Sequence, residues 1–330
     1  MKFFYKISFL FFIGLFPIFY ACSKNISTDN SSEEKGGYLF AHMTPSNYGH
    51  LYYSVSRDGL HWKTLNKGEE ISSSFLGHPS IVKGRDNNYY MIGVSTSGDL
   101  RYPILWYTSD LINWKQKKLE RNIFDVSSFG YSNENVYIGA PKIFYDEDRL
   151  IYMITWHAYK TGTVDNAEWE SMRTYYILTK DWETFTPAKR LFNFTGSDEN
   201  MATIDAIICK VGNIYYAIMK DERWPDKYPA VGKTIRIAKS NNLTGPYSNP
   251  GAAITPSWHE APTVIQSSDG KEWYLYTEHY TVSTYDLFES STLDGGMWKQ
   301  VTFSPPIARH GCVIKVDEKT YQGLLNAYEK

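Results

Sequence analysis

The sequence repeats one short phrase five times, and this repetition constrains the fold more than any other feature. Each copy has an alternating β-type segment, a Ser or Thr, a turn, and an aromatic residue on the returning side. The copies are LYYSVSRDGLHW (51–62), LWYTSDLINW (105–114), YYILTKDWETF (175–185), IRIAKSNNLTGPY (235–247) and DLFESSTLDGGMW (286–298). β-branched and aromatic residues on both sides of a turn are typical of a β-hairpin. Each copy therefore predicts a hairpin at the edge of a repeating unit.

A second phrase alternates with the first and consists of an apolar strand, a turn and a Tyr-rich strand. Its copies are HPSIVKGRDNNYYMIGV (78–94), APKIFYDEDRLIYMITW (140–156), DAIICKVGNIYYAIMK (205–220), EAPTVIQSSDGKEWYLYTE (260–278) and HGCVIKVDEKTYQGLLNAY (310–328). Two hairpins per unit make a four-stranded antiparallel sheet, and five such sheets around an axis make a β-propeller. We therefore predict an all-β fold, a five-bladed β-propeller, as a single domain over residues 38–330. A β-sandwich is the alternative, but its strands rarely repeat a whole four-strand phrase.

The order of the two phrases predicts how the ring closes. The chain begins with YLFAHMT and an edge hairpin, whereas it ends on an inner hairpin at Tyr328. The N-terminal strands are therefore expected to complete the last blade, which leaves no sheet edge open.

Residues 1–21 predict a signal peptide. Lys2 and Lys6 precede an almost wholly apolar run, residues 7–21. This run is short for a membrane span of ~20 residues. Cys22 follows directly and resembles the lipobox cysteine of bacterial lipoproteins, although Phe19 stands where Leu is usual. The resemblance implies lipidation at Cys22 and a place in the cell envelope, at the outer membrane, the cell surface or in the periplasm; an ordinary signal peptide with an incidental cysteine is the alternative.

Residues 22–37 are polar and lack periodicity, so we expect a flexible tether that meets the membrane only through the lipid. The formal net charge of −2 argues against a nucleic-acid partner, which would require a basic stripe. Cys209 and Cys312 lie in apolar runs, which favours buried free thiols over a disulfide. The chain has no CxxC or HExxH pair, so no sequence motif indicates a zinc site. We expect a monomer.

Polar residues stand at the starts of all five predicted inner strands. The innermost strand of each propeller blade lines the central channel, so these residues should converge on one mouth. They are His78, Lys142 with its neighbours 140 and 141, Asp205, Glu260, and Arg309 with His310. Strand starts are usually apolar or turn residues, and one polar example would carry little weight. Together, the five starts predict a polar binding site on the axis.

Six segments carry a family resemblance: YLFAHMT, GHLYYSVSRDGLHWKTLN, GAPKIFYD, IDAII, HEAPTVI and RHGCVI. In this order and at these blade positions they resemble glycoside hydrolase family 43 and its five-bladed relatives, which include arabinofuranosidases, xylosidases and galactosidases. The resemblance covers nearly the whole chain after the signal peptide. It implies an inverting glycosidase with a base Asp on the first inner strand, a modulating Asp on the third and a general acid Glu on the fourth.

Carried over by position, the resemblance makes Glu260 the general acid, Asp205 its modulator and His310 an axial histidine. Asp205 is expected to raise the pKa of Glu260 by like-charge repulsion, so that the acid keeps its proton. Inverting pairs stand ~6.5–9.5 Å apart, so that a water fits between base and sugar. No cofactor is required, although the resemblance allows a structural Ca²⁺ in the channel near His310.

The base Asp of the family is replaced in this chain. The family pattern Arg-Asp-Pro-His-Ile corresponds here to GHPSI (77–81), which puts His78 at the Asp position. Three interpretations stay open. His78 serves as the base, since an unperturbed imidazole has a pKa of about 6.5. Alternatively, the base is dispensable or supplied by a residue such as Glu168 or Glu170, or the chain is a non-catalytic surface glycan-binding protein.

Positive charge also distinguishes the predicted site. Lys142 stands in the place of a common Glu, and Arg309 and Lys220 add further cations. Such a pocket suits a uronic acid or a sulfated sugar, unless Lys142 simply pairs with Glu260 or Asp205.

Trp156 and Trp224 are the aromatic residues expected to stack on a sugar ring at the mouth. The sequence thus predicts a cell-envelope glycosidase that removes a terminal sugar from a polysaccharide or oligosaccharide. Its rivals are a glycan-binding propeller that has lost the chemistry and a structural propeller for protein contacts. The structural propeller would not need both Asp205 and Glu260 on the axis.

Overall fold

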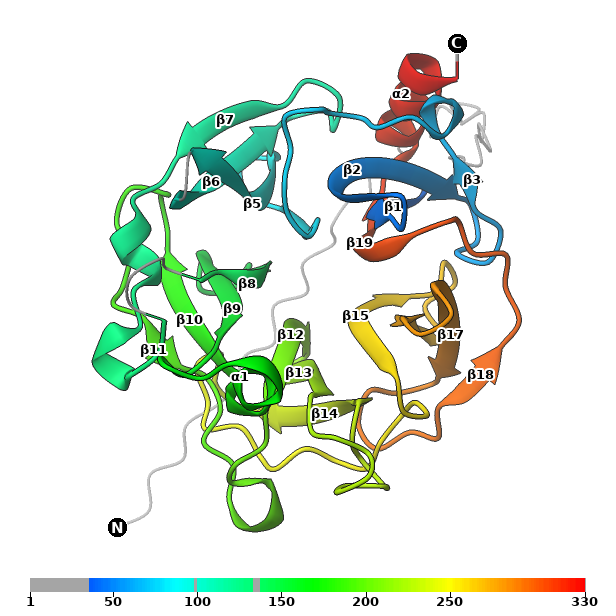
Figure 1. Ribbon diagram of the computed structural model, residues 1–330. Helices are drawn as coiled ribbons and strands as arrows, with labels where there is room; N and C mark the ends of the chain where they lie inside the picture. Colours follow the sequence, from blue (N-terminus) through cyan, green and yellow to red (C-terminus); the bar gives the residue numbers. More distant parts are fainter. Residues whose placement is uncertain (1–35, 98–99, 133–136, 330) are drawn as a thin grey trace, which may run out of the picture. The chain divides into compact units, whose positions relative to one another are not determined.

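The strands form five antiparallel sheets arranged as blades around one axis (Figure 1), which confirms the predicted five-bladed β-propeller. The computed structural model describes residues 36–97, 100–132 and 137–329. The predicted signal peptide and Cys22 lie outside these residues and stay predictions. Among the residues described, no helix has the length and apolar character needed to cross a membrane.

The closing blade joins the two ends of the domain, as the order of the phrases predicts. Its strands, from the axis outward, are β19 (Arg309–Val316), β1 (Gly37–Thr44), β2 (Asn47–Ser56) and β3 (Lys63–Thr64). The pairing of β1 with β19 runs in register from Gly37 opposite Val316 to Ala41 opposite Cys312. Figure 1 shows the blue β1 beside the orange-red β19. The N-terminal strands therefore complete the blade whose inner strand is C-terminal.

The other blades follow in chain order. The second contains β4 (Ile81–Lys83), β5 (Tyr89–Ser97), β6 (Leu100–Thr108) and β7 (Lys115–Lys118); the third contains β8 (Gly139–Asp146), β9 (Ile151–Ala158), β10 (Arg173–Thr179) and β11 (Lys189–Arg190). The fourth contains β12 (Thr203–Val211), β13 (Ile214–Asp221) and β14 (Thr234–Ser240); the fifth contains β15 (His259–Gln266), β16 (Trp273–His279), β17 (Thr284–Ser290) and β18 (Lys299–Val301). Helix α1 (Asp165–Ser171) and the 3₁₀ turns Asn66–Gly68, Arg121–Phe124, Ser127–Phe129 and Gly196–Asp198 lie in connections.

The predicted hairpin at 310–328 is wrong in its second half, which is helix α2 (Glu318–Tyr328). The Asp317 side chain accepts a hydrogen bond from the Thr320 amide at 2.8 Å and caps the helix N-terminus. Tyr321 and Leu324 are buried against the closing blade. Strand β1 already occupies the place beside β19, so the C-terminal residues have no strand position left.

The fourth blade has three assigned strands instead of the four that we predicted. The chain after β14 still runs along it, since the Ser248 amide donates to Lys239 O and the Gly251 amide to Ile237 O, both at 2.8 Å. Pro250 lacks an N–H group and interrupts this ladder.

The repeated Ser/Thr and Asp of the first phrase build one type of turn. Asp58, Asp110 and Asp181 each use Oδ1 to accept the amides two and three residues later, at 2.8–2.9 Å. An Asp side chain that bonds its own following backbone replaces part of a turn's hydrogen bonding. In these three copies, the phrase therefore specifies the edge hairpin through local hydrogen bonds.

Buried His42 of β1 generates a prediction about pH and stability. Its ring nitrogens lie 2.8 Å from Met43 O and 2.9 Å from Ser54 Oγ, and burial lowers its pKa from 6.5 to about 4. Between these values the unfolded chain binds more protons than the folded chain, so the free energy of unfolding falls as the pH is lowered. We expect the wild type to lose about 3 kcal/mol more than His42→Gln between pH 7 and pH 4. Urea unfolding at both pH values measures this difference, and equal losses would contradict the assignment.

Candidate active site

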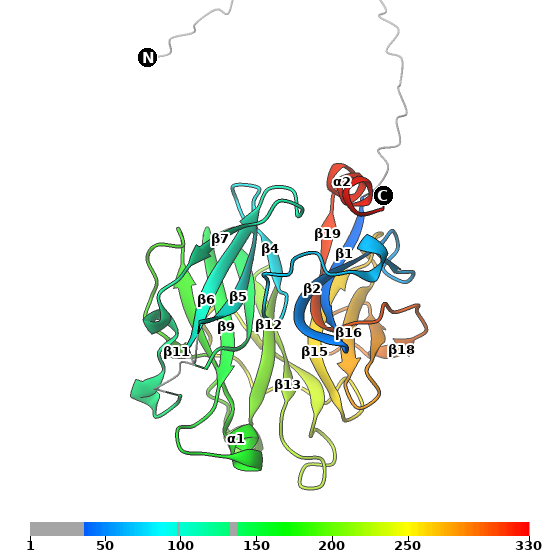
Figure 2. The ribbon, with the colours of Figure 1, turned by 45° about the horizontal axis from the view of Figure 1, so that its top comes forward.

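A cavity of about 570 Å³ lies at the end of the ring where α1 is placed. Figure 2 shows α1 and α2 at opposite ends of the blades, and Trp169 of α1 is part of the cavity wall. The wall contains residues from the starts of the predicted inner strands: His78, Ala140, Asp205, Glu260, Arg309 and His310. Residues far apart in the sequence are thus brought together on the axis, as the repeat predicts.

β-Bulges turn these strand starts toward the cavity. The register shifts near the starts of β8, β12, β15 and β19, and each shift contains a residue with positive φ. These residues are Ala140 (40°), Asp205 (54°), Ala261 (48°) and His310 (22°). A bulge bends its strand and re-aims the side chains beside it. The fold uses this device in four of its five inner strands.

Glu260 is held by three cationic or imidazole groups. Lys220 Nζ donates to Oε2 at 2.8 Å, His310 Nε2 lies 3.1 Å from Oε1, and Arg309 lies 3.4 Å from Oε1. Burial alone would raise the pKa of Glu260, but the charges of Lys220 and His310 outweigh it and hold the pKa well below its usual range. The expectation that Glu260 keeps its proton is therefore wrong for the free site, where Glu260 is ionised.

His310 connects Glu260 with Asp205. Its Nδ1 lies 4.0 Å from Asp205 Oδ2, which also accepts the Ala261 amide at 3.1 Å. Burial opposes a charge on the His310 ring, but Asp205, Glu260 and Glu278 outweigh burial and raise its pKa. Asp205 Oδ1 has no hydrogen-bond partner among the residues described. The free site thus combines an imidazole that favours its protonated form with the buried carboxylate of Asp205 and the partly buried carboxylate of Glu260.

His78 faces the cavity from the start of the second blade. Its Nε2 lies 2.8 Å from the Tyr48 hydroxyl, and its ring centroid is 4.2 Å from that of His310. Burial, followed by the charges of His310 and Lys142, lowers the pKa of His78 well below its ordinary value. His78 is therefore a neutral imidazole near pH 7.

Both lysines that we predicted to bind substrate, Lys142 and Lys220, lie behind the cavity wall. Lys220 pairs with Glu222 at 2.8 Å as well as with Glu260, and Glu222 pairs in turn with Lys233. Lys142 is 3% exposed, and its Nζ has no hydrogen-bond partner in the described part of the chain. No ion pair within 4.0 Å joins Lys142 to Glu260 or Asp205 there, so the alternative pairing is not found.

The prediction for Trp156 is wrong, because its side chain is 2% exposed and packs in the core against Phe124. Its neighbour His157 lines the cavity instead. Successive side chains of a strand point to opposite sides, so only one of the two can face the cavity. Trp224 also lies outside the wall and packs over Lys233, with 4.2 Å between Nζ and the ring centroid.

Sequence reasoning missed two tyrosines that contribute to the wall, Tyr48 and Tyr137. Tyr48 is 51% exposed in β2, next to the β1–β2 turn. An aromatic residue at the tip of a hairpin was the feature of the sequence that could have indicated its place in the wall. Glu168 and Glu170 do not line the cavity, and Glu170 pairs with Lys227 at 2.9 Å.

The donor set around His310 does not fit calcium. Ca²⁺ takes six to eight oxygen ligands. The described residues offer Asp205, Glu260 and Glu278, but Lys220 and Arg309 already bond the two glutamates. The predicted calcium stays a prediction, and no chemical step is assigned to it.

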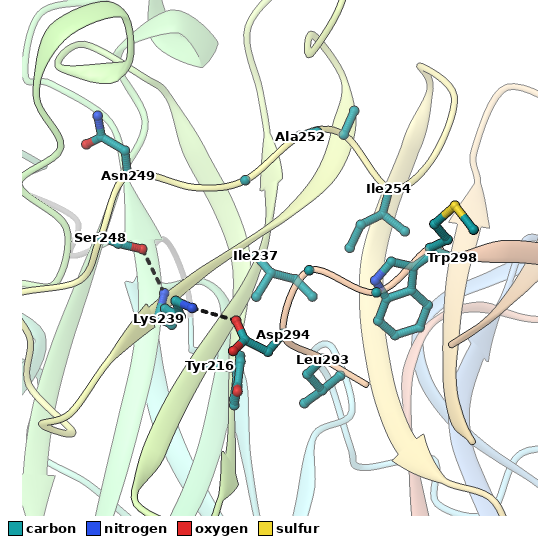
Figure 3. A pocket seen from close by; sticks show the side chains of 15 residues that line it. Tyr216, Ile237, Lys239, Ser248, Asn249, Ala252, Ile254, Leu293, Asp294 and Trp298 are labelled. Atoms are coloured by element: carbon teal, nitrogen blue, oxygen red, sulfur yellow. Dashed lines mark hydrogen bonds and ion pairs between the residues drawn. The ribbon is translucent and has the colours of Figure 1, made fainter. Parts of the chain in front are cut away.

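A second cavity, of about 540 Å³, lies beside the outer part of the fourth blade. Figure 3 shows Lys239 between Ser248 and Asp294, with Trp298 on the opposite side. Lys239 Nζ donates to Asp294 Oδ1 at 2.5 Å, and Asp294 is the one carboxylate among the described lining residues. This groove lacks the paired acidic groups of the axial cavity.

Comparisons with known proteins bear on the fold and the family of this chain. A family model related to glycoside hydrolase family 43, described as a "Probable glycosyl hydrolase domain", matches residues 33–322. An α-L-arabinofuranosidase of Bifidobacterium longum is 21% identical over 262 residues, which cover 69% of this chain and 24% of that protein. The catalytic domain of a Coprinopsis cinerea family 62 α-L-arabinofuranosidase aligns with a TM-score of 0.51 and 11% identity over 84% of this chain and 78% of that one. An exo-β-1,3-galactanase of Phanerochaete chrysosporium aligns with a TM-score of 0.47 and 14% identity over 69% of this chain and 50% of that one.

The chain spans about a quarter of the bifidobacterial protein and half of the fungal galactanase chain. The alignment with the Coprinopsis cinerea domain shows a shared propeller fold, and the family match covers nearly all of the described residues. The chain therefore belongs to the family of glycosyl hydrolase domains related to glycoside hydrolase family 43.

Proposed function

We propose that this chain is a glycoside hydrolase that removes a terminal sugar by single displacement, with Glu260 as the general acid. One observation carries the proposal: His310 lies between two carboxylates of the axial cavity, 3.1 Å from Glu260 and 4.0 Å from Asp205. A proton shared by this imidazole and the adjacent carboxylate can pass to a glycosidic oxygen as the bond between that oxygen and the sugar breaks. The cavity volume of about 570 Å³ lies within the ordinary range for small-molecule sites.

The proton for Glu260 would come from His310. Glu260 is ionised in the free site, and the raised pKa of His310 makes this imidazole the adjacent proton source. As the leaving oxygen develops negative charge, it draws the proton through Glu260. Asp205 would act as a positioning residue, because its Oδ2 accepts the amide of Ala261, the residue that follows Glu260.

His78 is the proposed base. A neutral imidazole keeps a lone pair that can accept a proton from an attacking water. The Tyr48 hydroxyl bonds Nε2 in the free site, so a water reaches that nitrogen when Tyr48 turns aside. Glu168 and Glu170 suit the role less well because they lie outside the cavity wall.

An acidic sugar is the second candidate substrate, and one observation favours it. Arg309 lines the cavity, and its side chain is 26% exposed beside Glu260. Lys142 and Lys220 lie behind the wall, and burial lowers the pKa of Lys142. Arg309 is therefore the cation that a substrate carboxylate or sulfate would reach.

Hydrolysis by the full chain, purified in mild detergent, tests the proposal on a panel of neutral and acidic oligosaccharides. We expect release of a monosaccharide, with a loss of about 10²–10⁴-fold for Glu260→Gln and for His78→Ala, because each removes a proton-transfer group. Sugar binding should persist in Glu260→Gln. The exposed Glu147→Gln is the matched control and should keep full activity.

Each outcome of this panel separates two interpretations. Loss with Glu260→Gln alone would place the base elsewhere. Binding without release from any substrate would identify a glycan-binding protein and overturn the proposed activity.

The pH dependence of kcat tests the role of His310. A proton donor must be protonated, so the rate should fall as the pH rises through a pKa above 6.5. His310→Gln should lower kcat and remove this alkaline fall. An unchanged pH profile in the variant would show that another group supplies the proton.

Lys220 should contribute strongly to stability because it pairs with buried Glu222 and with Glu260, whose side chain is 12% exposed. Breaking a buried ion pair by removing one partner costs about 3–5 kcal/mol. We expect Lys220→Met to lower the free energy of unfolding by this amount. The control Lys239→Met removes an exposed ion pair and should cost under about 1 kcal/mol. Urea unfolding measures both, and equal costs would contradict the buried pairing.

A further inference from the structure

A group of metal-binding side chains lies in the fifth blade, outside the wall of the axial cavity: His259, His279 and Asp286. We propose that these three residues bind a divalent transition-metal ion, with Zn²⁺ as the best match to their chemistry. The site is independent of the proposed hydrolysis and uses none of its proton-transfer groups.

The strand register brings the three side chains to one face of the sheet. His259 of β15 pairs directly with His279 of β16, and Thr277 of β16 pairs with Asp286 of β17. Side chains two residues apart on a strand point to the same side. Asp286 is therefore a diagonal neighbour of His279, within reach of both imidazoles.

The hydrogen bonds of His259 leave one nitrogen directed at a carboxylate. Its Nδ1 lies 3.0 Å from the carbonyl oxygen of Pro256, which can only accept, so Nδ1 carries a proton. Its Nε2 lies 2.9 Å from Asp286 Oδ2. With the proton on Nδ1, Nε2 of His259 has a lone pair, as does Oδ2 of Asp286. Without a cation between them, these two acceptor atoms would repel each other. Either a second proton or a metal ion resolves this contact.

The distances suit one ion bound by all three residues. Asp286 Oδ2 is 2.9 Å from His259 Nε2 and 3.6 Å from His279 Nδ1. Two ligands of a tetrahedral zinc, each ~2.0–2.1 Å from the metal, stand about 3.3 Å apart. The bond from His259 Nδ1 to a backbone carbonyl is also the usual way in which a metal-bound imidazole is oriented.

The donor types and their surroundings favour a transition metal. Two imidazoles with one carboxylate match Zn²⁺ better than Ca²⁺ or Mg²⁺, which prefer oxygen. Among the described residues, the ion-pair partners of Asp286 within 4.0 Å are these two imidazoles, so no Lys or Arg occupies the carboxylate. The side chains of His279 and Asp286 are 31% and 21% exposed, which lets an ion enter and leaves a coordination position for water.

An ion at this position would hold together the three inner strands of the fifth blade, β15, β16 and β17. His259 is the first residue of β15 and precedes Glu260. Because an ion that binds only the folded chain stabilises it, occupancy should raise the melting temperature.

The test is calorimetric titration of the full chain with ZnCl₂ after removal of metals with EDTA. We expect one ion per chain and a rise in Tm. His279→Gln and Asp286→Asn should each weaken binding at least about tenfold, since each removes a ligand. Both side chains are partly exposed, and circular dichroism without metal checks that the variants fold.

Two control variants locate the ion. His61→Gln disrupts a surface pair in which His61 Nδ1 lies 2.7 Å from Asp58 Oδ2, and it should bind zinc like the wild type. His78→Gln alters the histidine cluster of the axial cavity and should also keep the affinity. Absent binding, or affinity unchanged in His279→Gln and Asp286→Asn, would overturn the proposal and leave His259 as a doubly protonated partner of Asp286. Loss of binding in His78→Gln alone would overturn it in favour of an ion in the channel.

Discussion

The antiparallel pairing of β1 with β19 is the interaction on which the rest of the structure depends. It joins residues 37–43 to residues 309–316 and closes five separate sheets into one ring. Without this pairing, the inner strand of the closing blade would have a free edge, and Arg309 and His310 would not be fixed opposite Asp205 and Glu260. The geometry of the axial cavity is therefore a consequence of contacts between the two ends of the domain.

Within the cavity, removing a charged side chain from water costs free energy. Ion pairing offsets this cost and so determines which side chains stay ionised. Glu260 stays ionised because Lys220, His310 and Arg309 surround it, and Lys220 is held in turn by Glu222. Buried charges are tolerated when each has a partner with good geometry. The same arrangement places a proton-bearing imidazole beside a carboxylate, so that one set of contacts serves both stability and the proposed chemistry.

Much of the fold could be predicted from the sequence because its information is local and repeated. The Asp turns use bonds within four residues, and the strand patterns recur in every blade. Symmetry alone placed Asp205, Glu260 and His310 near one another. The β-bulges could not be predicted, since an Ala or His with positive φ has no clear sequence signature.

Ion pairs between residues far apart in the sequence could not be predicted either. The pairing of Lys220 with Glu260 depends on how the fourth and fifth blades meet, and it reverses the expected pKa shift of Glu260. Trp156 and His157 are consecutive residues of a strand, so their side chains point to opposite sides. The sequence does not show which of the two faces the cavity. The helix at 318–328 was missed because the predicted repeat was extended into a segment that has its own N-cap, Asp317.

Because the closing blade contains strands from both ends of the domain, the structure of the ring does not depend on the blade at which the chain starts. Gly37 at the start of β1 lies opposite Val316, immediately before α2, so the beginning and end of the propeller are neighbours in space. A short linker could join them, and the chain could begin at the connection between two other blades without changing any blade. The order in which the blades are encoded is thus interchangeable by circular permutation, whereas their order in space, which builds the cavity, is not.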